Sequence, residues 1–501
     1  MKILKDIIKG GLFLSLLAMG IFTFSGCDDE LQSINSNPNV VEDLADKYLF
    51  TNAARQVFRS PVHFFHFTYG SQYAHVYVSS NLARQVDAYL DAFTGDNYSD
   101  AFNFCKGPIR YANEVLDLTQ PGGKLENPVR YAMAKVLAVY SFSVITDAWG
   151  DIPYSEGGKG QQGVLRPVYD TQKSIYTSML EDLKNSEAAI RNGKLEQGYS
   201  GADPIFNNDL DKWGRFANSL RLRLAMRIRF ADEAMAKPII ADCLSKPLIE
   251  TNEQNVMQTN QDSDDGELYN PWYGTFAFWN FRLSKKYIDM LQTTADPRLP
   301  IMAQKTPAGT YVGVENGLAE SEQGKISFDN ISKPGSVFIG KAAPLFIITA
   351  AEVSFLRAEA ALFALGEQSD ANELYRKGIR LHMESLQVAD AKINEYLATP
   401  IVQLSGNLEA KFEQVSNQFW IACGANFFEA WTNIRRTGYP RIEQRTAAHL
   451  SKGATNGFLP KRFLYPQTEY SSNKANVEKA IAAQGADKID TPVWWDKRDM
   501  N

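Results

Sequence analysis

Cysteine is scarce in this chain of 501 residues: it occurs four times, at positions 27, 105, 243 and 423. No two cysteines form a C-x-x-C pair, and three, an odd number, remain if Cys27 has a separate role at the N-terminus. The sequence therefore predicts neither a disulfide framework nor a zinc site. Because a free cysteine packs like a small apolar residue, we expect the other three to be buried thiols.

Signatures of catalysis and of nucleic-acid binding are also missing. The chain has five histidines and contains no Gly-x-Ser-x-Gly, His-Glu-x-x-His or redox cysteine pair. Its net charge of −6 is spread along the chain without a basic stripe, which disfavours nucleic acid as a partner. We therefore predict a protein that is not an enzyme. The paired carboxylates of a glycosidase leave no linear signature, so a hydrolase stays open as an alternative.

The sequence contains no complete motif for a metal or phosphate site. His63 and His66 are three residues apart and could share a helical face, but no third ligand follows at a readable spacing. The acidic segment 262–267 does not place Gly and Glu at the offsets of a calcium-binding EF-hand loop. The Gly-rich segment 157–163 lacks the Gly-Lys-Ser/Thr ending of a phosphate loop. We predict no bound metal and no cofactor.

The N-terminus, by contrast, is informative. Three lysines precede an apolar run at 12–24, which is shorter than the roughly 20 residues that span a bilayer, and Ser-Gly-Cys27 follows. This pattern resembles a bacterial lipoprotein signal, so we expect residues 1–26 to be removed and Cys27 to carry a lipid. The acidic residues 28–30 resemble the surface-export signal of outer-membrane lipoproteins, which favours an outward-facing anchor. An ordinary secretory peptide is the alternative.

Helical periodicity dominates the chain beyond the anchor. Residues 27–41 are polar, contain Asn-Pro-Asn and have no helical period, which predicts an extended tether. We expect residues 42–501 to form a single helical body with a loop-rich, ligand-binding part near 251–344; two lobes also stay open at this length. The clearest helical segments are 129–148, 169–190, 212–234, 349–365, 370–383 and 408–422.

Two of these segments, on either side of Gly366, form the clearest predicted pair of helices. Small residues at the contact and a tyrosine in the groove allow two antiparallel helices to approach closely. These residues are Ala361, Ala371, Gly378 and Tyr375. The pattern resembles a tetratricopeptide unit, but no strict 34-residue repeat recurs. The predicted fold class is therefore mostly α: a degenerate tetratricopeptide-like scaffold with long irregular loops and little β.

Several longer strings carry a family resemblance. They are Thr146–Tyr154 (TDAWGDIPY), Trp213–Arg227, Thr349–Ala360, Glu429–Pro440 and Arg462–Pro466. Together they resemble the SusD/RagB family of nutrient-binding outer-membrane lipoproteins, and the match runs from Cys27 to the C-terminus. The chain is most similar to the branch with the Asn-Pro-Asn tether and the Trp-Gly-Asp-Ile-Pro-Tyr string.

The resemblance implies a helical body that captures cargo and passes it to a SusC-type TonB-dependent barrel in the outer membrane. Most of the matched positions are expected to be structural. In particular, the arginines at 221, 223 and 227 are expected to point away from the apolar stripe of their helix or to pair with carboxylates such as Glu352 or Glu359.

Segment 269–282 is the predicted ligand site, because seven of its fourteen residues are aromatic. Indole and phenol rings can stack on sugar rings or contact apolar peptide side chains, and amide and guanidinium groups can bond hydroxyls. The residues assigned these roles are Trp272, Tyr273, Trp279, Asn280 and Arg282. The alternative is that the segment only fills the core.

Three earlier residues, Tyr73, Tyr77 and Asn81, are predicted to form a rim of the site if their segment lies beside this loop. The resemblance implies that an early segment and a middle loop build the ligand face together, without fixing individual residues.

The sequence thus predicts a surface-exposed, lipid-anchored binding protein that captures oligosaccharide or peptide and delivers it to a transporter. A surface glycosidase or peptidase, or a purely structural lid for the barrel, are the alternatives. The sequence does not choose among starch, other glycans and peptides.

Overall fold

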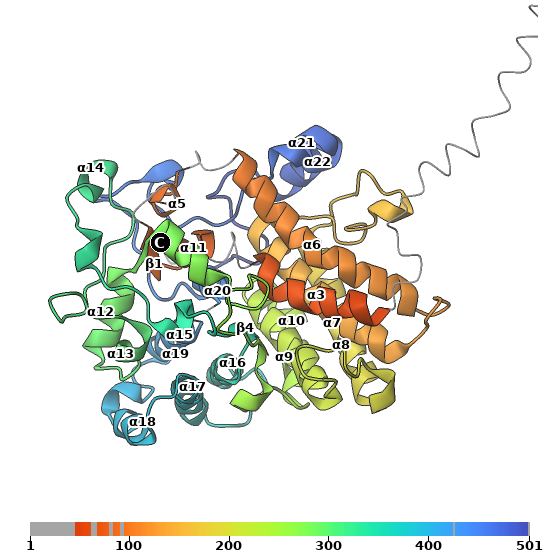
Figure 1. Cartoon of the computed structure of the whole chain (residues 1–501), viewed down its shortest axis with the longest axis horizontal. Helices are drawn as coiled ribbons and strands as arrows, with labels where there is room; N and C mark the ends of the chain where they lie inside the picture. Colours follow the sequence, from red (N-terminus) through yellow and green to blue (C-terminus); the bar gives the residue numbers. More distant parts are fainter. Residues whose placement is uncertain (1–45, 62–67, 80–83, 91–94, 424–425, 499–501) are drawn as a thin grey trace, which may run out of the picture. The chain divides into compact units, whose positions relative to one another are not determined.

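The computed structural model describes residues 46–61, 68–79, 84–90, 95–423 and 426–498 (Figure 1). The predicted signal peptide, the predicted lipid-carrying Cys27 and the predicted tether lie outside the described residues, as do His63, His66 and Asn81.

Helices make up most of the described chain, as predicted. The longer helices are α3 (Asp46–Pro61), α6 (Gly95–Thr119), α7 (Pro128–Trp149), α8 (Gln172–Arg191), α9 (Leu210–Ile228), α10 (Glu233–Leu244), α11 (Trp272–Trp279), α12 (Lys285–Thr293), α16 (Ala350–Leu362), α17 (Ala371–Ser385), α18 (Asp390–Leu397), α19 (Leu408–Ala422), α20 (Phe427–Thr437), α21 (Gln467–Ser472) and α22 (Lys474–Gln484). The short ones are α4 (Ser71–Tyr73), α5 (Arg84–Asp87), α13 (Leu299–Met302), α14 (Glu320–Gln323) and α15 (Ser336–Ile339).

Four short strands pair into two small antiparallel sheets. The strands are β1 (Tyr77–Ser79), β2 (Val256–Gln258), β3 (Phe281–Leu283) and β4 (Leu345–Ile348). β1 pairs with β3, and β2 pairs with β4 across an irregularity in register.

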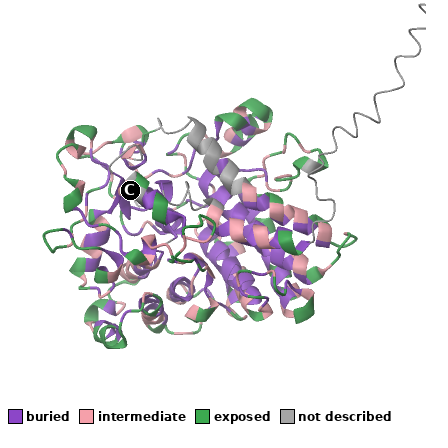
Figure 2. Cartoon of the chain, viewed as in Figure 1, coloured by how far each residue is buried: buried purple, intermediate pink, exposed green. Residues whose placement is uncertain are grey.

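Helices α3 and α6 to α10 pack against one another mainly in chain order, and α16, α17 and α19 form a second packed group (Figure 1). Figure 2 shows buried residues concentrated where these helices face one another. By length and composition α7 could cross a membrane, but 83% of its apolar window is buried inside the folded body. The apolar surface of α7 is therefore buried against neighbouring helices.

The predicted hairpin around Gly366 is confirmed. Gly366 has φ +101°, in the region that favours glycine, and ends the turn after α16. A Cβ at position 378 would lie 2.6 Å from the Phe355 ring, so the glycine there permits the close approach of α17 to α16. Thr349 caps α16 by accepting a hydrogen bond from the Glu352 backbone N–H (3.2 Å).

One predicted helix was too long. The segment 212–234 is helical only as far as Ile228, because Asp232 starts a new helix by accepting a hydrogen bond from the Met235 N–H (3.1 Å). Cys243 and Cys423 are buried free thiols, as predicted, and burial raises the pKa of Cys243 to about 12.

Two buried arginines of α9 are paired with carboxylates from distant helices. Arg223 donates to both oxygens of Glu352 (2.5 and 2.7 Å), which confirms one predicted pair. Arg227 pairs instead with Asp147 of α7 and Glu429 of α20. Because an unpaired charge at such a depth is costly, these contacts specify which helices must be neighbours.

A second buried cluster centres on Glu359 of α16. Its carboxylate receives Arg229, just beyond α9, and Arg436 of α20, each at 2.6 Å. Burial would raise the pKa of Glu359, but the two guanidinium groups hold that pKa below its ordinary value. Arg221 pairs with Asp242 of α10.

Candidate functional site

The two segments predicted to form the ligand site lie side by side. β1 follows the early aromatic segment, β3 follows α11, and the strands pair with Tyr77 opposite Leu283 and Ser79 opposite Phe281. The Ser284 N–H also donates to the Val76 carbonyl (2.8 Å). The early segment and the middle loop are therefore neighbours, as the sequence analysis expected.

The individual aromatic residues of that prediction need correction, because three of them belong to the core. Trp272, Tyr73 and Tyr77 are each about 1% exposed. Trp272 stacks on Phe427 of α20 at 5.2 Å between ring centroids, and Tyr77 meets the same ring at 4.9 Å. Tyr73 packs against Trp431 at 5.4 Å. Ligand cannot reach these side chains, so for them the core-filling alternative holds.

Arg282 and Asn280 also make contacts within the protein. The Arg282 guanidinium is 3% exposed and donates to the carbonyls of Phe328 (2.7 Å) and Phe281 (3.0 Å) and to Asn280 Oδ1 (2.6 Å). Burial lowers the pKa of Arg282, and Asp329 opposes that shift. Asn280 has φ +50°, a left-handed conformation that asparagine tolerates. The two residues hold the turn between α11 and β3. The guanidinium of Arg282 is too deeply buried to bond ligand hydroxyls, whereas Asn280 is partly exposed and its predicted ligand role stays a prediction.

Tyr273 and Phe278 are the exposed aromatic residues among the described side chains of α11, at 46% and 74%. Tyr269 lies at the edge of Tyr273, with ring centroids 6.0 Å apart. Lys341 Nζ lies 5.3 Å from the Tyr273 ring centroid and donates to Asp264 (2.5 Å). We call Tyr269, Tyr273, Lys341 and Asp264 the α11 face. The backbone of Trp279 lies in α11, but its side chain lies outside the described residues.

A pocket of about 260 Å³ adjoins the segment that carries Tyr269. It is lined by α3, by residues 204–205, and by the segment from β2 to the start of α11. Its walls are mixed, with the apolar residues Phe58, Ile205 and Leu268 beside the polar residues Arg55, Gln258, Gln261 and Glu267. Arg59 of α3 donates to the Gly266 carbonyl (2.5 Å) and to the Tyr269 carbonyl (3.3 Å), which fixes the two walls together. Guanidinium, amide and carboxylate groups of this kind suit the hydroxyls of a sugar.

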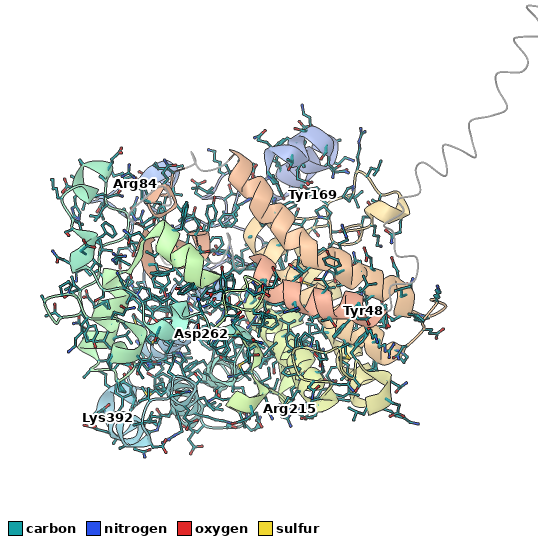
Figure 3. All side chains as sticks on the ribbon, in the orientation of Figure 1. Tyr48, Arg84, Tyr169, Arg215, Asp262 and Lys392 are labelled. Atoms are coloured by element: carbon teal, nitrogen blue, oxygen red, sulfur yellow. The ribbon has the colours of Figure 1, made fainter. Side chains whose placement is uncertain are left out.

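The acidic segment 262–267 is solvated and partly paired. Asp262 is exposed (Figure 3), and the hydrogen bond from Lys341 lowers the pKa of Asp264. Within the described ranges, no group of three His, Cys, Asp or Glu side chains is arranged to hold a metal ion. His75 is buried and its Nε2 lies 2.9 Å from the Tyr89 hydroxyl. Burial lowers the pKa of His75, which keeps the ring neutral.

Helical spacing could have separated the two faces of α11 at the outset. Residues four apart share a face, so Trp272 and Phe276 belong together and Tyr273 does not. Helical spacing could not have identified Lys341 as a neighbour of Tyr273, because 68 residues separate the two in the sequence.

Comparison with known proteins places the chain in a family. Residues 38–466 match the SusD-like family model described as starch-binding and associating with the outer membrane. No curated protein matches this sequence. A solved structure titled as a chitin-binding protein is 26% identical, with a TM-score of 0.77 and coverage of 91% of this chain and 100% of that one.

Two further solved structures are similar to this chain. A SusD homologue from Bacteroides uniformis is 28% identical, with a TM-score of 0.76 and coverage of 91% of this chain and 100% of that one. A chitin-binding SusD homologue from Flavobacterium johnsoniae is 23% identical and shares the fold, with a TM-score of 0.78 and coverage of 90% and 99%. The mostly helical fold and the family match agree, and this chain belongs to the SusD-like family of outer-membrane-associated proteins.

Proposed function

We propose that this protein is a surface-displayed lipoprotein that captures oligosaccharide on the α11 face and the adjoining pocket and passes it to a SusC-type TonB-dependent transporter. The observation that carries the proposal is the exposed ring of Tyr273, which has Tyr269 at its edge and Lys341 over it, next to a pocket with polar lining groups. A single exposed aromatic ring is common on protein surfaces, but rings gathered beside polar groups and a pocket mark a binding site. The family's description supplies carbohydrate as the ligand class.

The chemistry of the face suits sugar rings. The C–H face of a pyranose packs on the ring of Tyr273, with Tyr269 at its edge, while Lys341 and Asp264 offer a donor and an acceptor beside it. Stacking with a few hydroxyl bonds gives micromolar affinity, about 8 kcal/mol. Such moderate affinity lets loading alternate with release to the transporter.

Binding without catalysis is supported by the make-up of the pocket. Glycoside hydrolysis uses two carboxyl groups that flank the scissile bond. Glu267 lines the pocket and Asp264 lies on the α11 face, but the hydrogen bond from Lys341 lowers the pKa of Asp264, which makes this carboxyl unsuited to the general-acid role. We infer that the bound glycan leaves this site intact.

Anchoring is proposed from the N-terminal sequence. Lipid on Cys27 fastens the chain to the outer membrane, the tether at 28–41 separates the body from the lipid, and the acidic residues 28–30 direct it outward. A body held in this way lies close to an outer-membrane barrel, which the handover of cargo requires.

Three classes of ligand are to be tested for binding. Maltooligosaccharide follows from the family description, and oligomers of N-acetylglucosamine follow from the 26% identical chitin-binding relative. Peptide is the third class, because exposed aromatic rings also bind apolar peptide side chains. Isothermal titration calorimetry of the mature protein with each class identifies the cargo.

The decisive variant is Tyr273→Ala, with Tyr48→Ala as the matched control. Tyr48 is 60% exposed on α3, and Figure 3 shows it on the other side of the view from α11. Loss of one stacked ring costs about 1 to 1.5 kcal/mol, so we expect Tyr273→Ala to weaken the Kd about five- to tenfold. Tyr48→Ala should leave the Kd unchanged. Equal Kd values for both variants would remove the α11 face from the site.

A further inference from the structure

A larger pocket, separate from the α11 face, lies beside helix α12. Its volume is about 510 Å³, against about 260 Å³ for the pocket beside the α11 face. Its walls come from α12, from residues 315–316, and from residues 442–445 with Leu450. The two pockets share no lining residue. A space of this size accommodates a sugar residue.

The floor of this pocket is polar and is held in place by the protein. We call its three buried lining residues, His75, Asn316 and Arg445, the floor. His75 Nε2 lies 2.9 Å from the Tyr89 hydroxyl. Asn316 Nδ2 donates to Asp87 Oδ1 (2.7 Å), and the Arg445 guanidinium donates to the Asp87 carbonyl (2.5 Å). The floor is therefore rigid and formed without a ligand.

Most charged groups around the pocket are neutralised by a neighbour. Lys285 pairs with Asp289 on the next turn of α12, and His449 Nε2 lies 3.1 Å from Glu315. Arg445 Nη2 lies 3.6 Å from Asp87, behind the floor. These groups have partners within the protein and need none from a ligand.

Lys286 of α12 and Glu443 of the segment after α20 are the two charged lining residues that form no ion pair within the described ranges. Burial lowers the pKa of Lys286, and three carboxylates oppose that shift from beyond ion-pair distance: Glu443, Asp289 and Glu413. Burial also lowers the pKa of His75, and the Lys286 charge adds to that effect. The Lys286 ammonium therefore lies near the floor and near the carboxylates of the walls, without touching any of them.

We propose that this pocket binds one residue of a neutral sugar, whose hydroxyls accept from the Lys286 ammonium and donate to the Glu443 carboxylate. A hydroxyl both donates and accepts, so a ring with several hydroxyls satisfies both groups at once. Hydrogen bonds to a charged group are stronger than those between neutral groups, and a half-buried ammonium without a partner gains most from them. The proposal takes only its ligand class, carbohydrate, from the proposed function.

The rest of the lining agrees with a neutral ring. Partly exposed apolar side chains provide a surface for its C–H groups: Met290, Ile442 and Leu450. An acidic sugar would instead bring its carboxylate close to Glu443 and Asp289, and like charges at that distance repel. The pocket should therefore prefer a neutral sugar to the corresponding uronate.

Acetylation of lysines, read site by site by mass spectrometry, tests occupancy in the mature full-length protein. Because the pKa of Lys286 is lowered, more of its amine is neutral and open to acetylation. We expect saturable protection of Lys286 by at least one of glucose, galactose and N-acetylglucosamine. Glucuronate and galacturonate should need at least a tenfold higher concentration for the same protection. Lys237, exposed on α10, is the internal control and should react equally in every sample.

Two results of that experiment would overturn the proposal. One is the absence of protection by any of the three neutral sugars. The other is protection by a uronate or by glycine at the concentration at which the neutral sugar protects, since either result would assign the pocket to an anion or to a zwitterion.

Variants test the two groups separately, in a Tyr273→Ala background so that the α11 face does not contribute. Lys286→Met keeps the apolar stem and removes the ammonium, so we expect calorimetry to show at least tenfold weaker binding of the protecting sugar. Lys237→Met is the matched control and should leave the affinity unchanged. Glu443→Gln, at an exposed position, removes the repulsion, so the preference for neutral sugar over uronate should shrink.

Unchanged affinity in Lys286→Met, or an unchanged preference in Glu443→Gln, would overturn the proposal. Tyr273→Ala alone should leave the protection of Lys286 as it is in the wild type. Failure of the α11 face as a glycan site and failure of this pocket are therefore seen in different measurements.

Discussion

Replacing Glu359 with glutamine tests whether the buried ion pairs hold the helices together. Glu359 is 2% exposed and its carboxylate lies 2.6 Å from both Arg229 and Arg436. It therefore joins α16 to the end of α9 and to α20. Glutamine keeps the shape of the side chain, but it removes the negative charge and presents an N–H group to two cations.

The magnitude follows from the depth of the site. Breaking a buried pair by removing one partner typically costs about 3 to 5 kcal/mol, because the other charge stays buried without compensation. Here two guanidinium groups lose their shared carboxylate, so the upper part of that range applies. A body of this size has a urea m-value above the ~3 kcal/mol/M of small proteins, so the midpoint should fall by roughly 0.5 to 1 M.

Urea unfolding followed by tryptophan fluorescence measures the effect, and pH supplies an independent check. The folded-state pKa of Glu359 lies below its ordinary value of 4.5. Its stabilising contribution is therefore fully present above that value and is lost as the pH falls through the folded-state pKa. The difference between wild type and Glu359→Gln should shrink in acid below pH 4.5. A midpoint that moves by less than about 0.1 M at neutral pH would refute the reasoning.

Three further predictions concern the core, the hairpin and the anchor. Trp272→Ala should lower the free energy of unfolding by about 3 to 5 kcal/mol, because the ring fills the core against Phe427; a stable variant in thermal unfolding would contradict its burial. Gly378→Ala should lower the free energy of unfolding by about 1 to 2 kcal/mol, because the clash of the new methyl group with Phe355 outweighs the gain in helix propensity. A raised melting temperature would show instead that the Phe355 ring moves aside without cost. Cys27→Ser should abolish palmitate labelling and release the protein from the membrane fraction; retained label would place the lipid elsewhere.

Much of the fold was predictable because it depends on local patterns. Apolar residues at helical spacing located α7, α8, α16, α17 and α19. Helices α8 and α17 bury one face, whereas α7 and α16 are apolar and buried on most sides. The hairpin at Gly366 was predictable for a similar reason, because a glycine turn and small residues act within a short stretch of chain. Family membership came from ordered strings along the chain, which need no knowledge of contacts.

Which aromatic residues are buried and which are exposed was decided only by the tertiary structure. Segment 269–282 has the composition of both a core plug and an exposed face, and its residues divide between the two: Trp272 packs on Phe427, whereas Tyr273 is exposed. The ring-stacking partner of Trp272 is 155 residues away in the sequence. Composition records how much aromatic surface a segment has, but not which side another helix covers.

The same limit applies to charges. The sequence alone left two outcomes open for the arginines of α9: pointing away from the apolar stripe of their helix, or pairing with carboxylates. Only the packed structure decided that Arg227 takes Asp147 and Glu429. Such pairings depend on distances of a few ångströms between segments far apart in the chain, and those distances exist only once the helices have packed.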